Sequence, residues 1–181
     1  TFPPDSVESV IPNLAKSWEI SEDGLTYTFT LDENATFANG SAVTAEDVVF
    51  SFNRMKNLTG NPSFLAGGIA SVEAPDASTV VLTLSAPDPS ILAKLVFGAF
   101  SVVSKADVTA NGGTDAADAA TTDTAETWLN STSAGSGPYV LESWNPGVET
   151  VLVRNENYWG TPAAIERVIF RNIPEAATQK L

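Results

Sequence analysis

Residues 25–31 alternate strictly between apolar and polar side chains, in the order Leu25-Thr26-Tyr27-Thr28-Phe29-Thr30-Leu31. A period of two residues places the apolar side chains on one face and the threonines on the other, which is typical of a half-buried β-strand. Residues 15–20, Ala15-Lys16-Ser17-Trp18-Glu19-Ile20, precede this run as a second strand candidate, and Asp23-Gly24 lies between the two. Because glycine adopts a positive φ without strain, these residues predict a β-hairpin with a tight turn.

A helix is predicted to follow the turn at Asn39-Gly40. Thr44 is the expected N-cap, with Asp47 three residues later as its capping partner. Apolar residues then recur from Val48 at helical spacing and are expected to face the core. Glu46 and Asp47 could form an acid–base pair, but capping and the helix dipole explain their position in the first turn better.

The remaining sequence predicts further hairpins and helices. Strands are expected at 69–74 and 79–84, a helix from Asp88-Pro89 to Gly98, and a short buried strand at 100–103. Later elements are strands at 139–144, 148–154 and 165–172, and a helix that begins at Pro174. This order predicts an α+β fold, in which antiparallel β-hairpins and a mixed sheet pack with helices.

Charge and composition exclude several functions. The chain of 181 residues has 22 acidic and 9 basic residues, a net charge of −13, and neither Cys nor His. Such a surface repels nucleic-acid phosphates and anionic lipid headgroups, so no nucleic-acid partner is expected. Without Cys and His, Ser-His-Asp catalysis, Cys-His catalysis and the usual zinc sites are not available. We expect no cofactor and no metal site.

Residues 107–126 differ from the rest of the chain in composition. The stretch carries five acidic residues and no basic one, among Ala, Thr, Asn and Gly. The acidic residues lack the spacing of a calcium loop. We therefore expect an acidic, solvated and mobile loop, with bounds of 109–126.

Six motifs occur along the chain in an order that resembles a known family. The motifs are Pro12-Asn13-Leu14-Ala15-Lys16-Ser17-Trp18-Glu19, Phe37-Ala38-Asn39-Gly40, Thr44-Ala45-Glu46-Asp47-Val48-Val49-Phe50-Ser51, Gly135-Ser136-Gly137-Pro138-Tyr139, Arg154-Asn155-Glu156-Asn157-Tyr158-Trp159-Gly160 and Phe170-Arg171-Asn172-Ile173-Pro174. Together they resemble the family 5 extracellular solute-binding proteins, which are the receptors of ABC importers for peptides, oligopeptides and nickel chelates.

The resemblance implies a partial chain of a larger, two-lobed protein with a type II periplasmic-binding-protein-like architecture. Residues 1–108 are expected to be the small subdomain of the first lobe, and 109–126 the acidic loop. Residues 127–181 would begin the main sheet of that lobe and leave it incomplete. Because a solute binds between the lobes, this chain is expected to supply one wall of the pocket.

The resemblance also suggests where a ligand would be contacted. It places a pocket-lining segment after the second helix, which makes Phe97 and Phe100 the candidate ligand-binding residues. The alternative for both is ordinary core packing. Structural roles are favoured for the four other large aromatics, Trp18, Trp144, Tyr158 and Trp159. Ser136 lies between glycines, has no histidine to activate it, and is expected only to set the path of the backbone.

The expected function is the extracellular substrate-binding component of an ABC importer. It would capture a small-molecule solute, with peptide as the expected class, and deliver it to an ABC permease in the membrane. Because the chain has no histidine, nickel would have to arrive chelated. The expected location is extracellular or periplasmic, tethered to the outer face of the cell membrane. Two alternatives remain: a carboxylate-based glycoside hydrolase, and a cell-surface interaction module without a small-molecule ligand.

Overall fold

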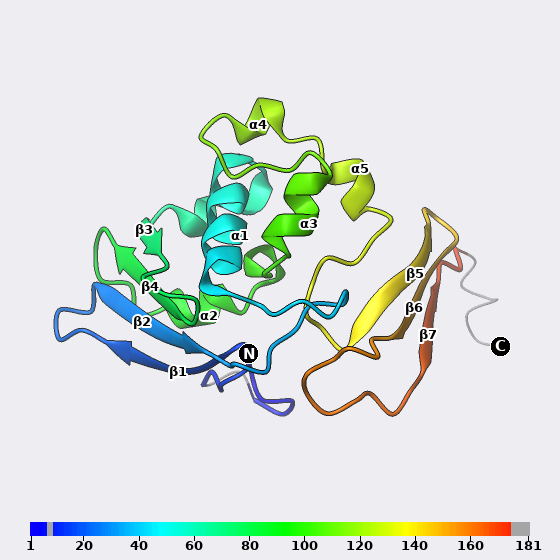
Figure 1. Cartoon of the computed structure of the whole chain (residues 1–181), viewed down its shortest axis with the longest axis horizontal. Helices are drawn as coiled ribbons and strands as arrows, with labels where there is room; N and C mark the ends of the chain where they lie inside the picture. Colours follow the sequence, from blue (N-terminus) through cyan, green and yellow to red (C-terminus); the bar gives the residue numbers. More distant parts are fainter. Residues whose placement is uncertain (7–8, 175–181) are drawn as a thin grey trace.

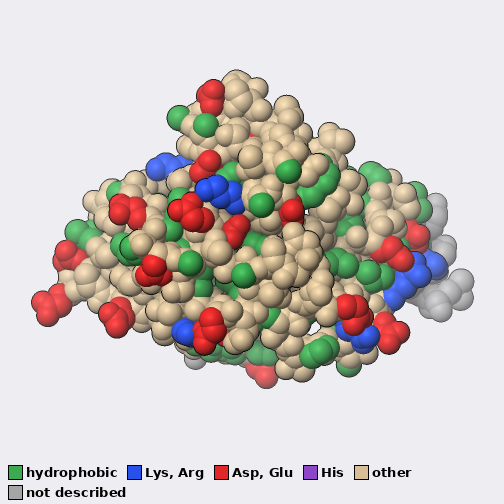
Figure 2. Space-filling view, viewed as in Figure 1, with side chains coloured by type: hydrophobic (Ala, Val, Ile, Leu, Met, Phe, Trp, Pro, Cys, Tyr) green, Lys and Arg blue, Asp and Glu red, His purple; other side chains and the backbone are tan. Residues whose placement is uncertain are grey.

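The computed structural model describes residues 1–6 and 9–174 and contains two antiparallel sheets. A four-stranded sheet has the order β1-β2-β4-β3, and a three-stranded sheet has the order β5-β6-β7. Figure 1 shows the sheets at opposite ends of the long axis, with the helices above and between them. Acidic side chains are spread across the face of the molecule in Figure 2. The predicted mixture of hairpins and helices is confirmed.

The first sheet is built on the predicted hairpin. Strands β1 (Ala15–Ile20) and β2 (Thr26–Leu31) are antiparallel, and Gly24 in their turn has a φ of +68°. Strands β3 (Ile69–Glu73) and β4 (Thr79–Leu84) complete the sheet. Phe29 of β2 pairs with Trp18 of β1 and Val80 of β4, so apolar side chains from three strands share one face.

Helix α1 (Ala45–Asn57) covers part of this apolar face. The Asp47 carboxylate accepts hydrogen bonds from the Thr44 backbone N–H at 2.9 Å and from the Thr44 hydroxyl at 2.7 Å. It also accepts one from the backbone N–H of Lys105 at 2.9 Å. The predicted capping role of Asp47 is therefore confirmed, and the carboxylate also links the start of the helix to the backbone at Lys105 by a hydrogen bond.

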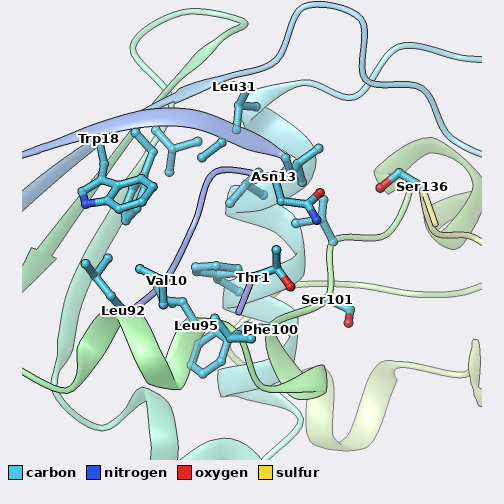
Figure 3. Close-up of a pocket in the computed structure, with 18 of the residues that line it drawn as sticks. Thr1, Val10, Asn13, Trp18, Leu31, Leu92, Leu95, Phe100, Ser101 and Ser136 are labelled. Atoms are coloured by element: carbon cyan, nitrogen blue, oxygen red, sulfur yellow. The ribbon is translucent and has the colours of Figure 1, made fainter. Parts of the chain in front are cut away.

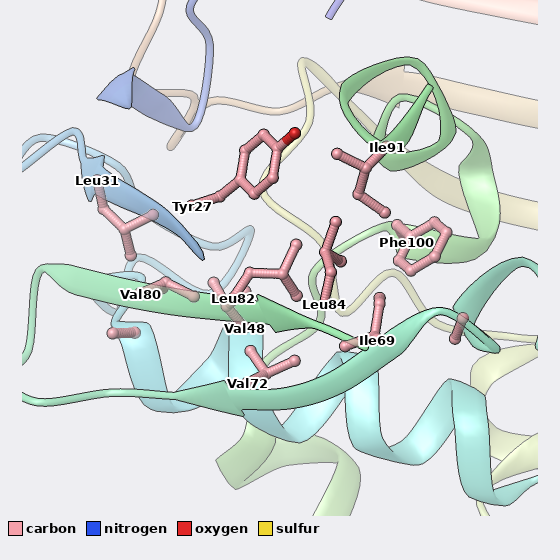
Figure 4. Packing of buried hydrophobic residues seen from close by; sticks show 12 residues of the cluster. Tyr27, Leu31, Val48, Ile69, Val72, Val80, Leu82, Leu84, Ile91 and Phe100 are labelled. Carbon is pink, nitrogen blue, oxygen red and sulfur yellow. The ribbon is translucent and has the colours of Figure 1, made fainter. Parts of the chain in front are cut away.

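The main core lies between α1 and the first sheet. Figure 4 shows Val48 of the helix beside Val80, Leu82 and Val72 of the strands. Helix α2 (Ile91–Leu95) and the short 3₁₀ helix η2 (Gly98–Phe100) add Ile91 and Phe100 to the same cluster. A second 3₁₀ helix, η1 (Asn61–Ala66), connects α1 to β3.

Of the two elements predicted in residues 88–103, one is shorter than expected and the other is absent. The helix expected from Asp88 to Gly98 is present as α2, and it begins later because Asp88–Ser90 form a turn in which the Asp88 carboxylate accepts from the Ser90 N–H at 2.9 Å. The strand expected at 100–103 is absent from this described part of the chain. Instead, the backbone N–H of Val103 donates to the Ser51 hydroxyl at 3.0 Å, and no neighbouring strand pairs with it.

The segment 109–126, which was expected to be a solvated loop, is largely exposed, but it contains a short helix and several buried small residues. Helices α3 (Lys105–Ala110), α4 (Ala119–Thr122) and α5 (Glu126–Leu129) occupy this region and its flanks. Val108, Ala119 and Ala125 are buried, and Val108 and Ala125 pack in a second apolar cluster with Phe50 of α1. The acidic composition concealed these contacts because small residues, alanine above all, form the buried positions.

The second sheet contains β5 (Tyr139–Asn145), β6 (Glu149–Arg154) and β7 (Arg167–Arg171). The predicted hairpin is confirmed, with Gly147 at a φ of +76° in its turn. The two halves are joined by hydrogen bonds, among them that from the Asn157 side-chain amide to the Ala38 carbonyl at 2.8 Å. The helix predicted from Pro174 onward lies outside the described residues.

Candidate functional site

An apolar pocket of about 450 Å³ lies on the helix-covered face of the first sheet. Helix α1 packs mainly on β3 and β4, so other segments cover the part of the face that β1 and β2 form. Helix α2, residues 10–14 and residues 135–137 complete the wall there. The floor consists of buried side chains of the main core, namely Leu31, Val48, Val80, Leu82 and Phe100.

Half-buried apolar side chains form the sides of the pocket. Trp18 and Phe29 come from paired positions on β1 and β2, and Leu92 and Leu95 come from α2. Figure 3 shows Trp18 and Leu92 at one end of the pocket, with Leu95 and Phe100 beside them. Phe52 of α1 meets Phe100 edge to face, with ring centroids 5.1 Å apart. This end is therefore uniformly apolar and built largely from aromatic and leucine side chains.

The opposite end of the pocket carries uncharged polar side chains. Figure 3 shows Asn13, Ser101 and Ser136 there, away from Trp18. Among the described residues, the side chains of these three form no hydrogen bond with another protein group. No Asp, Glu, Lys or Arg in the described part of the chain lines the pocket. The α-ammonium of Thr1 also lines the pocket and donates to the Ile11 carbonyl at 3.1 Å, so the site offers apolar contact, neutral hydrogen-bonding groups and one cationic group.

The structure separates the two candidate ligand-binding residues. Phe100 is 4% exposed and belongs to the floor of the pocket. Phe97 is 59% exposed and does not line the pocket, because it precedes η2 with an extended backbone and points away from the core. Phe100 lies in the core, which was the alternative to ligand contact, and it also lines the pocket. Contact of either residue with a ligand remains a proposal.

Sequence reasoning missed most of the pocket wall. A structural role was favoured for Trp18, yet it lines the pocket; its pairing with Phe29 is the signal that could have placed it there. Asn13 and Ser101 carry no such signal, because they come from irregular segments that meet only in the fold. Trp159 has the expected structural role, since its indole N–H donates to the Ser136 carbonyl at 3.1 Å.

A second hollow lies beside the start of α1, and the charged groups that line it are already paired. The Lys105 ammonium lies 2.8 Å from the Glu46 carboxylate across it, and both oxygens of Asp47 accept the capping bonds described above. Hydrogen bonding by the Glu46 carboxylate raises the pKa of Lys105. These groups stabilise the local structure, so the apolar pocket is the stronger candidate for ligand binding.

Neither a metal cluster nor a membrane-spanning helix occurs in the parts of the chain that the structure describes. Residues 1–6 and 9–174 contain no group of three or more Asp, Glu, His or Cys side chains that could hold a metal ion. In the same residues, no helix is long and apolar enough to cross a bilayer.

Comparison with known proteins gives a family match over nearly the whole chain. Residues 9–181 match the family model described as "Bacterial extracellular solute-binding proteins, family 5 Middle". The chain is 36% identical over 169 residues to the probable D,D-dipeptide-binding periplasmic protein DdpA of Escherichia coli K12. That alignment covers 93% of this chain and 31% of the relative. The chain therefore spans about a third of the length of this curated relative.

Solved structures of similar proteins share the fold. The chain superimposes on MoaA of A. tumefaciens R10, solved in complex with mannopinic acid, with a TM-score of 0.79 and 29% identity. It superimposes on the periplasmic binding protein DppA of Helicobacter pylori, in complex with the peptide STSA, with a TM-score of 0.74 and 27% identity. These matches cover 93% and 95% of this chain, and 32% and 36% of the other chains.

Proposed function

The chain belongs to the bacterial extracellular solute-binding proteins of family 5, and on that premise we propose that it forms part of the solute-capturing component of an ABC importer. The observation that carries the proposal is the family match over residues 9–181. Peptide is the proposed class of solute. It is supported by the relatives named for dipeptide binding and by the similar structure solved with a peptide.

The proposed role of this chain is to supply one wall of the binding site. The chain spans about a third of the relative's length. From the order of its motifs we assign it to the first lobe of a two-lobed protein, with residues 1–108 as the small subdomain. A second lobe would close over the solute and exclude water from it. Phe97 is exposed and could contact the solute directly, whereas Phe100 would act from the floor of the pocket.

The proposed partner is an ABC permease, which would accept the solute from the closed form of the protein. The proposed location is outside the cytoplasm, in a periplasm or tethered to the outer face of the cell membrane. Named relatives are periplasmic proteins, which supports the first of these locations.

The two alternative functions gain no support. The relatives reported above are named as binding proteins. A glycoside hydrolase needs two carboxyl groups facing each other across a cleft. In the described part of the chain no carboxyl group lines the apolar pocket, and in the second hollow the carboxylates are engaged in capping and ion pairing.

Native mass spectrometry of a protein of the relatives' full length tests the proposal. Purified without unfolding and incubated with a library of di- to pentapeptides, the protein is expected to carry a peptide that is released on denaturation. The control is the same protein unfolded, washed and refolded, which should carry none until the library is added. Failure to retain any peptide, together with hydrolysis of chromogenic glycosides, would replace this function with the hydrolase alternative.

A further inference from the structure

The second sheet is connected to the first half of the molecule, which contains the four-stranded sheet and the helices, by one stretch of chain and one loop (Figure 1). Residues 130–138 lead from α5 into β5, and residues 155–160, in the loop between β6 and β7, return to the first half. None of the three apolar clusters in the described part of the chain contains a side chain from β5, β6 or β7. Because the two halves share no large apolar core, the orientation of the second sheet depends mainly on these two connections.

The connecting stretch is attached to the first half on one side of Ser136 and to the second half on the other. The backbone N–H of Ala38 donates to the Gly135 carbonyl at 3.1 Å. The side-chain amide of Asn155, a buried residue that follows β6, donates to the Gly137 carbonyl at 2.8 Å. Ser136 therefore lies between the two points of attachment, and the glycines on both sides have the backbone freedom that a hinge requires.

The loop between β6 and β7 holds this connection in one orientation. The Asn157 side-chain amide donates to the Ala38 carbonyl at 2.8 Å, and the Thr36 hydroxyl donates to the Asn157 carbonyl at 2.7 Å. The Trp159 indole N–H donates to the Ser136 carbonyl at 3.1 Å. The Trp159 side chain also packs on the third apolar cluster, which consists of Ala35, Phe37 and Val43. Rotation of the second sheet about Ser136 would separate these groups.

We propose that residues 135–137 are a hinge between two rigid bodies, and that Thr36, Asn157 and Trp159 hold the hinge in a single orientation. The inference concerns the conformation of the chain and goes beyond the proposed function, because it does not depend on which solute is bound. Residues 135–137 also line the apolar pocket, so the contacts that hold the hinge fix part of the pocket wall as well.

The test is a distance measurement between the two sheets by double electron–electron resonance. The chain has no cysteine, so nitroxide labels can be attached at two introduced ones, Glu19→Cys on β1 and Ile169→Cys on β7. Both positions are exposed, and the two sheets lie at opposite ends of the molecule (Figure 1). With all the contacts of the hinge present, one narrow distribution of distances is expected.

Two hydrogen bonds of the loop are then removed together by Thr36→Val and Asn157→Ala. The fraction of molecules outside the narrow peak should rise by roughly twofold to tenfold for each lost bond. The matched control is Asn111→Ala with Asn172→Ala, in which each asparagine loses a side-chain hydrogen bond made within its own half. The distribution should not change in this control, and circular dichroism verifies that each variant is folded.

Glycine substitutions locate the hinge. A Cβ at Gly135 would lie 4.0 Å from the Val102 carbonyl oxygen, and one at Gly137 would meet nothing within 4 Å, so alanine fits the folded backbone at both positions. Added to the variant that lacks the two hydrogen bonds, Gly135→Ala with Gly137→Ala should restrict the hinge and narrow the distribution again. Gly68→Ala, at an open position in the first half, should not narrow it.

Four results would overturn the inference. They are a broad distribution with all contacts present, a narrow one after Thr36→Val with Asn157→Ala, equal broadening in the asparagine control, and no narrowing by alanine at residues 135 and 137. If the variant with both substitutions does not fold, Asn157→Ala alone is measured. The broadening expected from one lost bond then supports the inference, and an unchanged distribution overturns it.

Discussion

The guanidinium of Arg54 and the carboxylate of Asp123 form a two-point ion pair in the interior. Arg54 Nε lies 2.7 Å from one carboxylate oxygen and Nη2 lies 2.9 Å from the other, and the side chains are 14% and 2% exposed. Asp123 also accepts from the backbone N–H groups of Thr114 and Ala125. This ion pair connects helix α1 to the acidic segment that follows α3.

Removing the cation should be strongly destabilising. In Arg54→Leu, the Asp123 carboxylate would stay buried without its partner, and a loss of about 3–5 kcal/mol in the free energy of unfolding is expected. Urea unfolding followed by circular dichroism measures this loss. The matched control is Lys105→Leu, which breaks an exposed pair with Glu46 and should cost no more than about 1 kcal/mol. Similar losses in the two variants would contradict the structural role of Asp123.

The surface pair of Asp88 and Lys94 predicts a measurable pKa. A hydrogen bond from the Lys94 ammonium, together with one from the Ser90 hydroxyl, lowers the pKa of Asp88 to about 2. Because the folded-state pKa is below the unfolded value, the stabilisation is present at neutral pH and is lost as pH falls from about 4 to about 2.

Carboxyl-carbon NMR of the folded chain checks this value. In Lys94→Met, the pKa of Asp88 should rise toward its ordinary value of 3.8. The pKa of Asp76 is lowered mainly by hydrogen bonds from Ser78 and Thr79, so it should not change in the same variant. An unchanged Asp88 pKa would show that Lys94 is not its partner in solution.

Two glycines predict opposite responses to alanine. A Cβ at Gly113 would lie 2.3 Å from Val108 Cγ1 and 2.9 Å from the Val108 carbonyl oxygen, so Gly113→Ala should destabilise the chain by about 1–3 kcal/mol. A Cβ at Gly68 would meet nothing within 4 Å, and Gly68→Ala should be neutral or stabilise by up to about 1 kcal/mol. Equal effects in chemical denaturation would show that the segment around Gly113 is loosely packed.

The elements that sequence patterns predicted well are those determined by local chemistry. The alternation in residues 25–31 sufficed to identify β2, because Tyr27 and Leu31 on its apolar face are buried while the threonines of the other face are only half-buried. Thr44 and Asp47 sufficed to identify the start of α1, because capping involves residues three positions apart. Residues 139–154 were predicted as a hairpin for the same local reasons.

The wrong predictions concern segments that distant residues hold in place. Residues 100–103 have a strand-like composition, but Ser51 of α1 binds the backbone at Val103. Asp123 was predicted to lie in a solvated segment, because its partner Arg54 is 69 positions earlier in the chain and no local pattern indicates the pair. The pocket wall was missed for a similar reason, since Asn13, Ser101 and Ser136 come from three separate irregular segments.

The central claim is that this chain supplies one wall of a solute site that a second lobe completes. Isothermal titration tests it most directly, with one peptide titrated into the 181-residue chain and into a protein of the relatives' full length. A single wall leaves most of the peptide in water, so the account predicts an affinity at least about 100-fold weaker for the 181-residue chain. Equal affinities for the two proteins would contradict the account and place the whole site within these residues.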